Sequence, residues 1–506
     1  MTHTERTVFM RRFLPLILFA LVFVLCLTAC GKAPSVAEPD AEFPGTPHAL
    51  TAYIVVRGFE WGPGVSKIVA ELDTEADAVV LGEDFSMSTG HWEREAESAY
   101  LSDELGNAVK TPSRYVAFDL VTSFDTTGSP FEMDMETEHN IWAEEYIVDA
   151  SFTVIIDDTR FGVRLYADCI ENRICPELDR FSVRDSVSGD YVNPFTRETE
   201  QLTLHYAAYE PDTLDSWEKN PLIVWLHGRG EGGTDIEKAI LGNEVSALTE
   251  PDIQSYFTAG DQVGAYVLVV QTPTYWMDGG DGKESRGDVP SRYTEILMDT
   301  ILQYLEQNPD ADPDRVYIGG ASNGGYMTLE MLINYPDFFA AAFPCSAAYA
   351  SRVYARDYRG NYRTFWGSYI PTRISYMTEE KAEKLCRTPI WFVAAMTDFI
   401  IPVFEYTVPV YQSILRSGAD NCWCSMYFGV VGTESSDTFY LGHWSWVYLL
   451  NDQVRLVQDP ALIRDSANPL FRGFQPSLEG GSVSVSDEGG AYDSIFRWLN
   501  AQERSS

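Results

Sequence analysis

The stretch Val316-Tyr317-Ile318-Gly319-Gly320-Ala321-Ser322-Asn323-Gly324-Gly325-Tyr326-Met327 decides the architecture of this chain. It begins with a short apolar run typical of a buried strand, turns at a glycine-rich corner, and continues as a helical pattern to Tyr335-Pro336. Residues 320–324 match G-x-S-x-G, a sharp strand-to-helix turn that exposes a serine at the end of a sheet. Only glycine fits beside so tight a corner. We therefore predict that Ser322 is a nucleophile above a helix N-terminus that favours a developing oxyanion. An ordinary exposed serine in a turn is the alternative.

From Leu202 onward, strand-like and helix-like segments alternate. The pattern between the strands is helical at residues 293–307, and this alternation predicts an α/β domain with a mostly parallel sheet covered by helices on both faces. In such sheets, sites gather at the carboxyl ends of the strands. An apolar run at 426–431 is expected to end the sheet. The other apolar runs with strand character are Leu222–Leu226, Ala265–Val270, Val316–Ile318 and Pro389–Ala395.

A serine nucleophile needs a base and an acid that orients the base. In α/β-hydrolases these follow the serine in the order Asp or Glu, then His. Only His443 follows Ser322, so His443 is the predicted base. Asp398 is the predicted acid, because it alone closely follows a strand of core character. A structural histidine and a surface aspartate are the alternatives. The other acids considered between the two residues are Asp337, Asp357, Asp420, Glu434 and Asp437.

The glycine-rich run His227-Gly228-Arg229-Gly230-Glu231-Gly232-Gly233 follows an early strand. Attack by serine creates an oxyanion that needs two backbone N–H donors. We predict that the amides of Asn323 and Arg229 supply them, with Gly230 as the second choice for the latter. Dinucleotide binding competes, because Gly228, Gly230 and Gly233 satisfy G-x-G-x-x-G. The next strand ends in Gln271-Thr272-Pro273 without an acid for a ribose, so no cofactor is predicted.

Residues 49–190 carry short strand-like runs separated by acidic, glycine- and proline-bearing segments, which predicts a small all-β sandwich. Clear runs are Ala52–Val56, Tyr115–Val121 and Phe152–Ile156. Lone histidines (His91, His139) and tryptophans (Trp92, Trp142) in this part are interpreted as packing or solvated residues, not chemistry. The second domain is expected to span 191–506.

The N-terminus has the pattern of an exported protein. A basic start precedes the apolar run Phe13–Leu27, which is too short for a comfortable membrane span and typical of a signal peptide. Leu27-Thr28-Ala29-Cys30-Gly31 resembles the lipobox of bacterial lipoproteins. That resemblance implies removal of residues 1–29, lipid on Cys30, and a membrane lipoprotein at the cell surface or the periplasmic side. Residues 30–48 read as a flexible acidic linker. An uncleaved anchor is the alternative.

Composition narrows the class of partner. The chain has 506 residues and a formal net charge of −39, which argues against nucleic acid because phosphate backbones are bound by basic surfaces. Beyond Cys30, six cysteines remain, and Cys169 and Cys175 flank a short turn that a disulfide would staple. No cysteine and histidine pair has zinc-ligand spacing, so no metal is predicted.

Taken as a set, the motifs resemble the polyhydroxybutyrate-depolymerase-like esterases of the α/β-hydrolase family, in particular members with an N-terminal immunoglobulin-like domain. The aromatic-glycine run at 56–65 is similar to the opening of that domain. The residues that carry the resemblance are Trp225–Glu231, Gln271–Pro273 with Tyr275-Trp276, Gly320–Gly325, Pro389–Trp391 with Asp398 and Pro402, and Gly442–Trp446.

The resemblance implies an esterase that hydrolyses small-molecule or polymer-linked carboxylic esters through an acyl-enzyme. Two alternatives stay open: a serine peptidase similar to prolyl oligopeptidases, and a catalytically silent surface binding lipoprotein. The Tyr- and Arg-rich segment 352–376 lies between elbow and acid, where lids commonly sit, and we predict that it covers the acyl pocket. Which ester is cleaved does not follow from the sequence.

Overall fold

A computed structural model describes residues 47–504, except residues 91, 127, 212–218, 259, 261, 360–362, 366–367, 434–436 and 469–470. The predicted signal peptide, Cys30 and nearly all of the predicted linker lie outside the described residues. Within the described residues, no helix has the length and apolar character that a membrane crossing requires.

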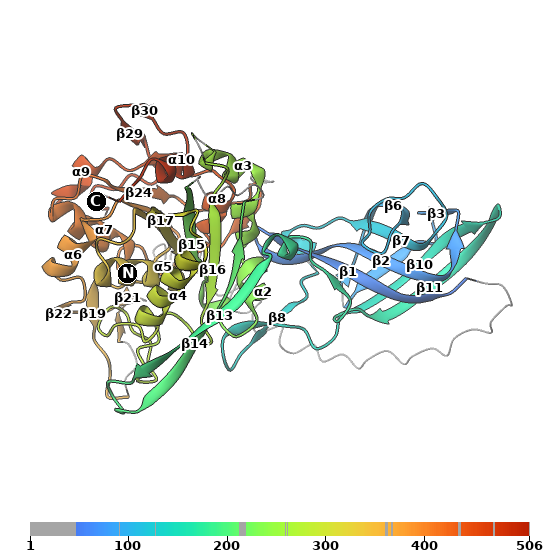
Figure 1. Cartoon of the computed structure of the whole chain (residues 1–506), viewed down its shortest axis with the longest axis horizontal. Coiled ribbons are helices and arrows are strands. Elements are labelled where there is room, and N and C mark those ends of the chain that lie inside the picture. Colours follow the sequence, from blue (N-terminus) through green and yellow to red (C-terminus); the bar gives the residue numbers. More distant parts are fainter. Residues whose placement is uncertain are drawn as a thin grey trace, which may run out of the picture. The chain divides into compact units, whose positions relative to one another are not determined.

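The first domain consists of two β-sheets (Figure 1). One sheet has the order β12-β1-β2-β7-β6 and contains β1 (Ala49–Phe59), β2 (Gly62–Ala76), β6 (Ala96–Ser102), β7 (Ser113–Leu120) and β12 (Arg173–Ile174). The other has the order β11-β10-β4-β5, with β3 also paired to β10, and contains β3 (Ala78–Val80), β4 (Ser86–Thr89), β5 (Trp92–Glu93), β10 (Ile147–Ile156) and β11 (Thr159–Asp168).

Alternating side chains build the core between these sheets. Every second residue of β10 from Val148 to Val154 is buried, as expected for a strand with one face on a core. Phe152 of β10 meets Phe118 of β7 edge to face, with 5.0 Å between the ring centroids. The predicted sandwich is confirmed. Short elements follow its strands: η1 (Phe124–Thr126), the hairpin β8 (Phe131–Asp134) and β9 (His139–Trp142), and η2 (Leu178–Arg180).

The second domain is organised around an eight-stranded sheet of order β13-β14-β16-β15-β17-β18-β23-β24. The first two pairings are antiparallel and the others parallel, which confirms the predicted mostly parallel sheet. Its strands are β13 (Val183–Val192), β14 (Thr199–Tyr209), β15 (Asn220–Leu226), β16 (Tyr266–Gln271), β17 (Ala311–Ala321), β18 (Ala341–Cys345), β23 (Ile390–Ala395) and β24 (Cys422–Tyr427).

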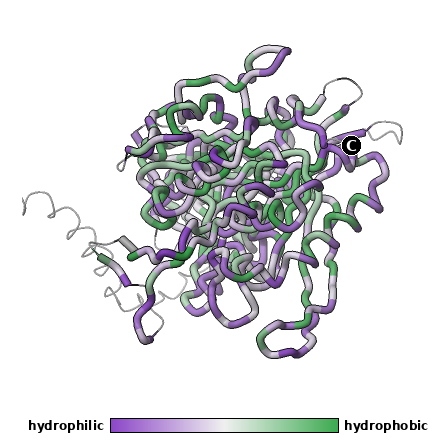
Figure 2. Tube along the Cα trace, turned by 90° about the vertical axis from the view of Figure 1, so that its left-hand side faces the viewer, coloured by the Kyte–Doolittle hydropathy of each residue, from purple (hydrophilic) through white to green (hydrophobic). Residues whose placement is uncertain are grey.

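Both faces of the sheet are covered, because β15 is buried along its whole length and its side chains alternate between two apolar clusters. Leu222, Val224 and Leu226 belong to the cluster that contains residues of α4 (Thr294–Gln307), α5 (Asn323–Asn334), α6 (Glu379–Leu385), α7 (Thr407–Arg416) and α9 (Pro460–Arg464). Ile223 and Trp225 belong to the cluster that contains residues of α2 (Ile236–Leu241), α8 (Trp446–Leu450) and α10 (Ile495–Asn500). Along the Cα trace, hydrophobic and hydrophilic residues are interspersed (Figure 2).

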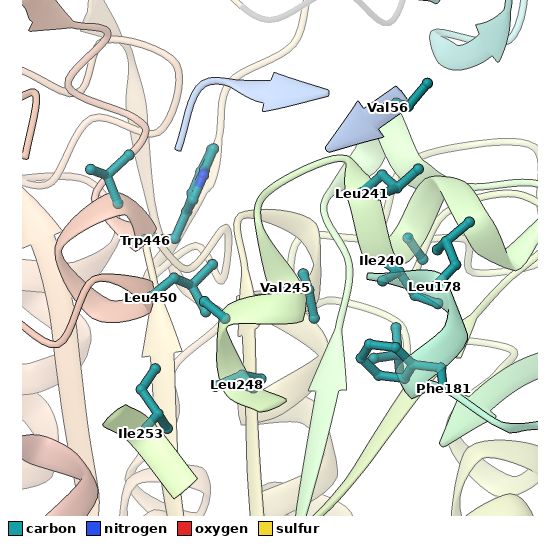
Figure 3. Close-up of a cluster of buried hydrophobic side chains, with 14 of the residues drawn as sticks. Val56, Leu178, Phe181, Ile240, Leu241, Val245, Leu248, Ile253, Trp446 and Leu450 are labelled. Carbon is teal, nitrogen blue, oxygen red and sulfur yellow. The ribbon is translucent and has the colours of Figure 1, made fainter. Parts of the chain in front are cut away.

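The second of these clusters continues into the first domain. Figure 3 shows its central part, with side chains from a sandwich strand, from η2 and the residue after it, and from the helices around η4 (Val245–Thr249). The labelled residues are Val56, Leu178, Phe181, Ile240, Leu241, Val245, Leu248, Ile253, Trp446 and Leu450. An apolar contact of this kind removes hydrophobic surface of both domains from water, so each domain stabilises the other.

Three details differ from the sequence-based expectations. The boundary expected at residues 190/191 falls inside β13, an edge strand of the eight-stranded sheet, so the sheet favours a boundary before Val183. The last strand is β24, which ends at Tyr427, whereas Val430–Val431 (β25) forms a separate hairpin with Phe439–Tyr440 (β26). The staple between Cys169 and Cys175 is not formed, since both are free.

Short elements complete the second domain. They are η3 (Arg229–Glu231), α3 (Pro251–Gln254), η5 (Ser255–Phe257), β19 (Arg352–Tyr354), β20 (Thr364–Phe365), β21 (Ser368–Tyr369), β22 (Pro371–Ser375), β27 (Leu456–Val457), β28 (Val483–Ser484), β29 (Ser486–Asp487) and β30 (Gly490–Ala491).

Candidate active site

Ser322 lies at the corner between β17 and α5, as the G-x-S-x-G pattern predicts. Its backbone has φ 55° and ψ −107°, a left-handed φ that non-glycine residues rarely adopt. Such conformations cost about 1–3 kcal/mol and persist where the surroundings hold them. Here the Ser322 N–H donates to the Cys345 carbonyl at 2.9 Å, and the Ser322 carbonyl accepts from Ala348 N at 3.1 Å. The strained corner is therefore fixed by the neighbouring strand β18.

The two glycines of the pattern allow β15 to approach the corner. A Cβ on Gly320 would lie 2.5 Å from the Leu226 carbonyl oxygen, and one on Gly324 would lie 2.0 Å from the same atom. Either side chain would push the serine away from the end of β15. The glycine-rich loop that follows Leu226 is thus brought next to the N-terminus of α5.

His443 and Asp398, far apart in the sequence, form a buried pair. His443 Nδ1 lies 2.8 Å from Asp398 Oδ2, and the Asp398 side chain is fully buried. Asp398 Oδ1 accepts from the backbone N–H groups of Ile400 (3.0 Å) and Ile401 (2.8 Å). With Nδ1 facing a carboxylate, the imidazole presents Nε2 as its proton acceptor.

Close packing sets the distance between the acid and the histidine. A Cβ on Gly442 would lie 2.4 Å from the Thr397 carbonyl carbon, so the two loops touch at the residue before each functional side chain. The edge of the His443 ring meets Trp446 at 5.4 Å between centroids and 86° between planes. His443 therefore has little freedom to turn away from Asp398.

Ser445 is a neighbour of His443 whose hydrogen-bond partner sequence reasoning missed. Its Oγ lies 2.9 Å from Ser346 Oγ, and Ser346 directly follows the Cys345 carbonyl that holds Ser322. This buried hydrogen bond links residues 441–445, the loop that carries His443 (the histidine loop), to the end of β18 beside the Ser322 corner. The serine two residues after His443 was part of the motif set, but nothing in its position along the chain indicates Ser346 as its partner.

The predicted oxyanion loop runs through Gly228 into η3. His227 fixes its start, because His227 Nε2 accepts from Thr272 N at 3.1 Å and Nδ1 faces the Gly228 carbonyl at 2.5 Å. Burial lowers the pKa of His227 to about 3, so the ring stays neutral with its proton on Nδ1. His227 is thus a structural histidine and not a competing base.

The two predicted donor residues are Arg229, within this loop, and Asn323, the first residue of α5. The Asn323 side chain is buried and its Oδ1 accepts from Trp276 N at 2.5 Å, which ties the start of α5 to the loop after β16. The Arg229 guanidinium pairs with Glu138 at 2.7 Å and Glu284 at 3.2 Å, and it lies over the Tyr275 ring. These contacts fix both side chains, and the backbone amides of the two residues stay the predicted oxyanion donors.

Glu231 is buried underneath the same loop. A Cβ on Gly228 would lie 2.9 Å from Glu231 Oε2, and one on Gly242 would lie 2.6 Å from Glu231 Cγ. Burial raises the pKa of Glu231 to about 7, against the opposing effect of its hydrogen bond with Asn243. A side chain enclosed in this way braces the loop and is not open to a substrate.

The first domain also contacts this loop, through the β8–β9 hairpin. Trp142 Nε1 donates to Asp235 Oδ2 at 2.9 Å, and His139 lies so close to Gly232 that a Cβ there would be 2.6 Å from His139 Nε2. Burial lowers the pKa of His139, which suits a neutral packed ring. Both residues were interpreted as packing residues from the sequence, and the structure places them at the domain contact.

A dinucleotide does not fit the glycine-rich loop. The loop continues as a three-residue 3₁₀ helix, not as an α-helix whose free N–H groups would face a pyrophosphate. The next helix, α2, has its N-terminus capped by Asp235, whose carboxylate accepts from Glu237 N at 3.2 Å. Among the described residues, no group of three His, Cys, Asp or Glu side chains is arranged to hold a metal ion.

Known protein families match the two domains of the chain separately. Residues 51–159 match the family model described as "Esterase Ig-like N-terminal domain". Residues 298–412 match the model of the prolyl oligopeptidase family, which includes Ser322 and Asp398 and stops before His443. The chain joins an esterase-type immunoglobulin-like domain to an α/β-hydrolase domain. A solved thermostable esterase supports this fold, with a TM-score of 0.56, 21% identity, and coverage of 80% of this chain and 97% of its own.

Two curated relatives match parts of the chain. Poly(3-hydroxyalkanoate) depolymerase C from Paucimonas lemoignei is 35% identical over 69 residues, 14% of this chain and 15% of that protein. Feruloyl esterase B from Neurospora crassa is 31% identical over 157 residues, 29% of this chain and 44% of that protein. The chain therefore spans less than half the length of each of these relatives.

Proposed function

We propose that the protein is a serine esterase whose α/β-hydrolase domain cleaves carboxylic esters. One observation carries this proposal. The strained Ser322 corner and the buried His443–Asp398 pair follow strands of the same sheet. The names of the curated relatives, a polyester depolymerase and a feruloyl esterase, agree with an ester substrate.

In the proposed mechanism, Ser322 Oγ attacks the acyl carbon while His443 Nε2 takes its proton. Asp398 keeps the imidazole oriented and stabilises the imidazolium. The Asn323 and Arg229 amides stabilise the oxyanion, and His443 then protonates the departing alcohol. Water, activated by the same imidazole, attacks the acyl-Ser322, and the acid leaves with regeneration of the serine.

A peptidase is the second candidate, because the hydrolase domain matches the prolyl oligopeptidase family. Two observations favour the ester. The domain before the hydrolase is a single sandwich, not a propeller that would cage the site. Glu231, the carboxyl group beside the oxyanion loop, is only 6% exposed and cannot hold the free amine of an exopeptidase substrate.

The test is a matched pair of substrates that share one acyl group, one an aryl ester and the other a prolyl or alanyl amide. We expect a higher kcat/KM for the ester, and its loss in Ser322→Ala by about 1,000-fold or more. A higher kcat/KM for the amide, also lost in Ser322→Ala, would instead establish a peptidase. A folded protein that hydrolyses neither substrate would support a silent binding lipoprotein.

Segment 352–376 is proposed to shape the acyl pocket. It contains the pairs β19–β22 and β20–β21, and Tyr354 Oη donates to the Glu405 carbonyl at 3.3 Å, seven residues beyond Asp398. Tyr358 and Phe365 are exposed, which is consistent with contacts to a bulky acyl group. Trimming this segment should change the preference among short, long and aromatic esters, and an unchanged preference would refute the lid.

The membrane attachment is also a proposal, based on the lipobox-like sequence around Cys30. Cys30→Ser should remove the lipid without loss of ester hydrolysis, since the predicted linker separates the lipid from the folded domains. Mass analysis of the mature N-terminus decides the matter, because a variant that still carried lipid there would rule out Cys30 as the attachment site.

A further inference from the structure

Glu60 is a buried carboxylate of the first domain, and within the part of the chain that the structure describes its side-chain hydrogen bonds all come from the hydrolase domain. It lies in the turn between β1 and β2, within the aromatic-glycine run at 56–65, and is 5% exposed. Thr433 N donates to both carboxylate oxygens at 3.1 Å, and Thr433 Oγ1 donates to Oε2 at 2.5 Å. Tyr440 Oη donates to Oε1 at 2.6 Å. A carboxylate is costly to bury, and such charge-assisted hydrogen bonds offset that cost.

The residues that Glu60 holds lead directly to His443. Thr433 follows β25, and Tyr440 is the last residue of β26, which pairs with β25. Only Leu441 and Gly442 separate Tyr440 from His443, and Gly442 is packed against Thr397 beside Asp398. A displacement of Tyr440 is therefore passed to His443 through only two residues, one of which, Gly442, is packed against backbone.

Aromatic contacts from the first domain support the same loop. The Phe124 ring of η1 meets Tyr440 at 5.1 Å and Trp444 at 6.1 Å, both edge to face. Trp444 is the residue after His443. Three residues after His443, Trp446 belongs to the buried cluster shared with Val56 (Figure 3). The first domain thus contacts the chain shortly before His443 and immediately after it.

We propose that Glu60 is a positioning residue for His443, and that the immunoglobulin-like domain is thereby a working part of the ester-hydrolysing site. The inference rests on the proposed function, since it assigns His443 the role of base. Glu60 does not touch the substrate in this account. It fixes the hairpin that leads to His443, so that Nδ1 stays on Asp398 and Nε2 keeps the orientation that the proposed proton transfer from Ser322 requires.

The chain offers a matched control in Glu177. This glutamate also belongs to the first domain, is also 5% exposed, and accepts hydrogen bonds from Arg57 Nε at 2.9 Å and Gly58 N at 2.6 Å. Both of its partners lie in β1, two and three residues before Glu60, and neither is a residue of the hydrolase domain. Glu177→Gln therefore reports what the loss of a buried carboxylate next to this turn does while the hydrogen bonds from Thr433 and Tyr440 to Glu60 are kept.

The experiment measures the rate constant for labelling of Ser322 by a fluorophosphonate, together with kcat, KM and the thermal midpoint. In Glu60→Gln an amide N–H₂ replaces one carboxylate oxygen. Because this group donates and cannot accept, a hydrogen bond from Thr433 or from Tyr440 is lost. We expect the labelling rate and kcat to fall about 10- to 100-fold with KM within about 2-fold, as a misplaced base requires. Tyr440→Phe, which removes one hydroxyl, should lower both rates less. Glu177→Gln should lower the thermal midpoint and leave kcat within about 2-fold.

The combination of Glu60→Gln with Tyr440→Phe should be no slower than Glu60→Gln alone, because both remove the same tether. The proposal is overturned if Glu60→Gln keeps the wild-type labelling rate, or if it and Glu177→Gln lower kcat equally. If Glu60→Gln does not fold, Tyr440→Phe tests the proposal instead. A wild-type labelling rate in Tyr440→Phe would also overturn it. A wild-type protein that is not labelled at Ser322 would overturn the proposed function itself.

Discussion

The oxyanion loop and the histidine loop are both held by the immunoglobulin-like domain, but by different kinds of contact. At the oxyanion loop, the ion pair between Arg229 and Glu138 is partly exposed, with 35% and 59% of the two side chains accessible. At the histidine loop, the buried carboxylate of Glu60 accepts hydrogen bonds from Thr433 and Tyr440. Exposed ion pairs are worth about 0–1 kcal/mol, whereas loss of a buried charged hydrogen-bond partner costs more. The histidine loop is therefore the more sensitive of the two.

Alanine at a glycine of each loop tests this difference most strongly. A Cβ on Gly442 would meet backbone at 2.4 Å, whereas the nearest atoms to a Cβ on Gly230 belong to the Asn140 side chain, the first at 3.1 Å, and a side chain can turn aside. Gly442→Ala should lower kcat by about 100-fold or more, because His443 moves relative to Asp398. Gly230→Ala should stay within about 3-fold, since a side chain can adapt where backbone cannot. Steady-state kinetics on one aryl ester compares them, and equal losses would show that the loops do not differ.

Glu231 gives the oxyanion loop a dependence on pH. Its pKa is raised by burial from 4.5 to about 7, so the folded protein holds the proton more tightly than the unfolded chain. The free energy of unfolding should therefore fall by about 3 kcal/mol as pH rises from 4.5 to above 7. Glu231→Gln, which cannot ionise, should lack this loss. Urea unfolding of the wild type and Glu231→Gln at pH 5 and pH 8 measures this loss of stability. The same change with pH in both proteins would show that burial does not raise the pKa of Glu231.

Much of the site was predictable because its signals are local. The glycines around Ser322, the position of Asp398 just after a strand, and the single histidine downstream each depend on residues close in sequence or on simple chain order. The structure brings Asp398 and His443 together as expected. The Glu60 tether was not predictable, because Glu60 and Thr433 are 373 residues apart and neither pattern points to the other.

The start of β13 was not predictable from the sequence for a related physical reason. β13 is an edge strand on which Val187 is the one buried residue, so it lacks the apolar run that reveals the central strand β15. A strand that contributes little to the core leaves little hydrophobic pattern in the sequence. Its assignment depends on backbone hydrogen bonds to β14, which no composition reveals.

Trp142 provides an intermediate effect at the oxyanion loop. Trp142→Phe removes the hydrogen bond to Asp235 and weakens the contacts with Phe131 and Arg173. We expect a loss of about 1–2 kcal/mol in the free energy of unfolding, and a fall in kcat of less than about 5-fold. Chemical denaturation and ester kinetics measure the two. A drop in kcat as large as that of Glu60→Gln would show that catalysis depends equally on the contacts of the first domain with both loops.

The smallest effect is expected for Glu138. Glu138→Gln breaks the ion pair with Arg229, but the guanidinium keeps its contact with Glu284 and the Tyr275 ring. Stability should change by less than about 1 kcal/mol and kcat by less than about 2-fold, and the difference should shrink further in 0.5 M salt. A fall in kcat as large as that of Glu60→Gln, at low and high salt alike, would show that catalysis depends on the exposed ion pair as much as on the buried carboxylate.

The most direct test of the whole account is the site at which a fluorophosphonate attaches. The wild-type protein, digested after labelling and analysed by mass spectrometry, should carry one adduct, on the peptide that contains Ser322. His443→Ala should carry far less in the same time, because the serine has lost its base. An adduct on a different serine, or equal labelling of the wild type and His443→Ala, would contradict the assignment of Ser322 and His443 as nucleophile and base.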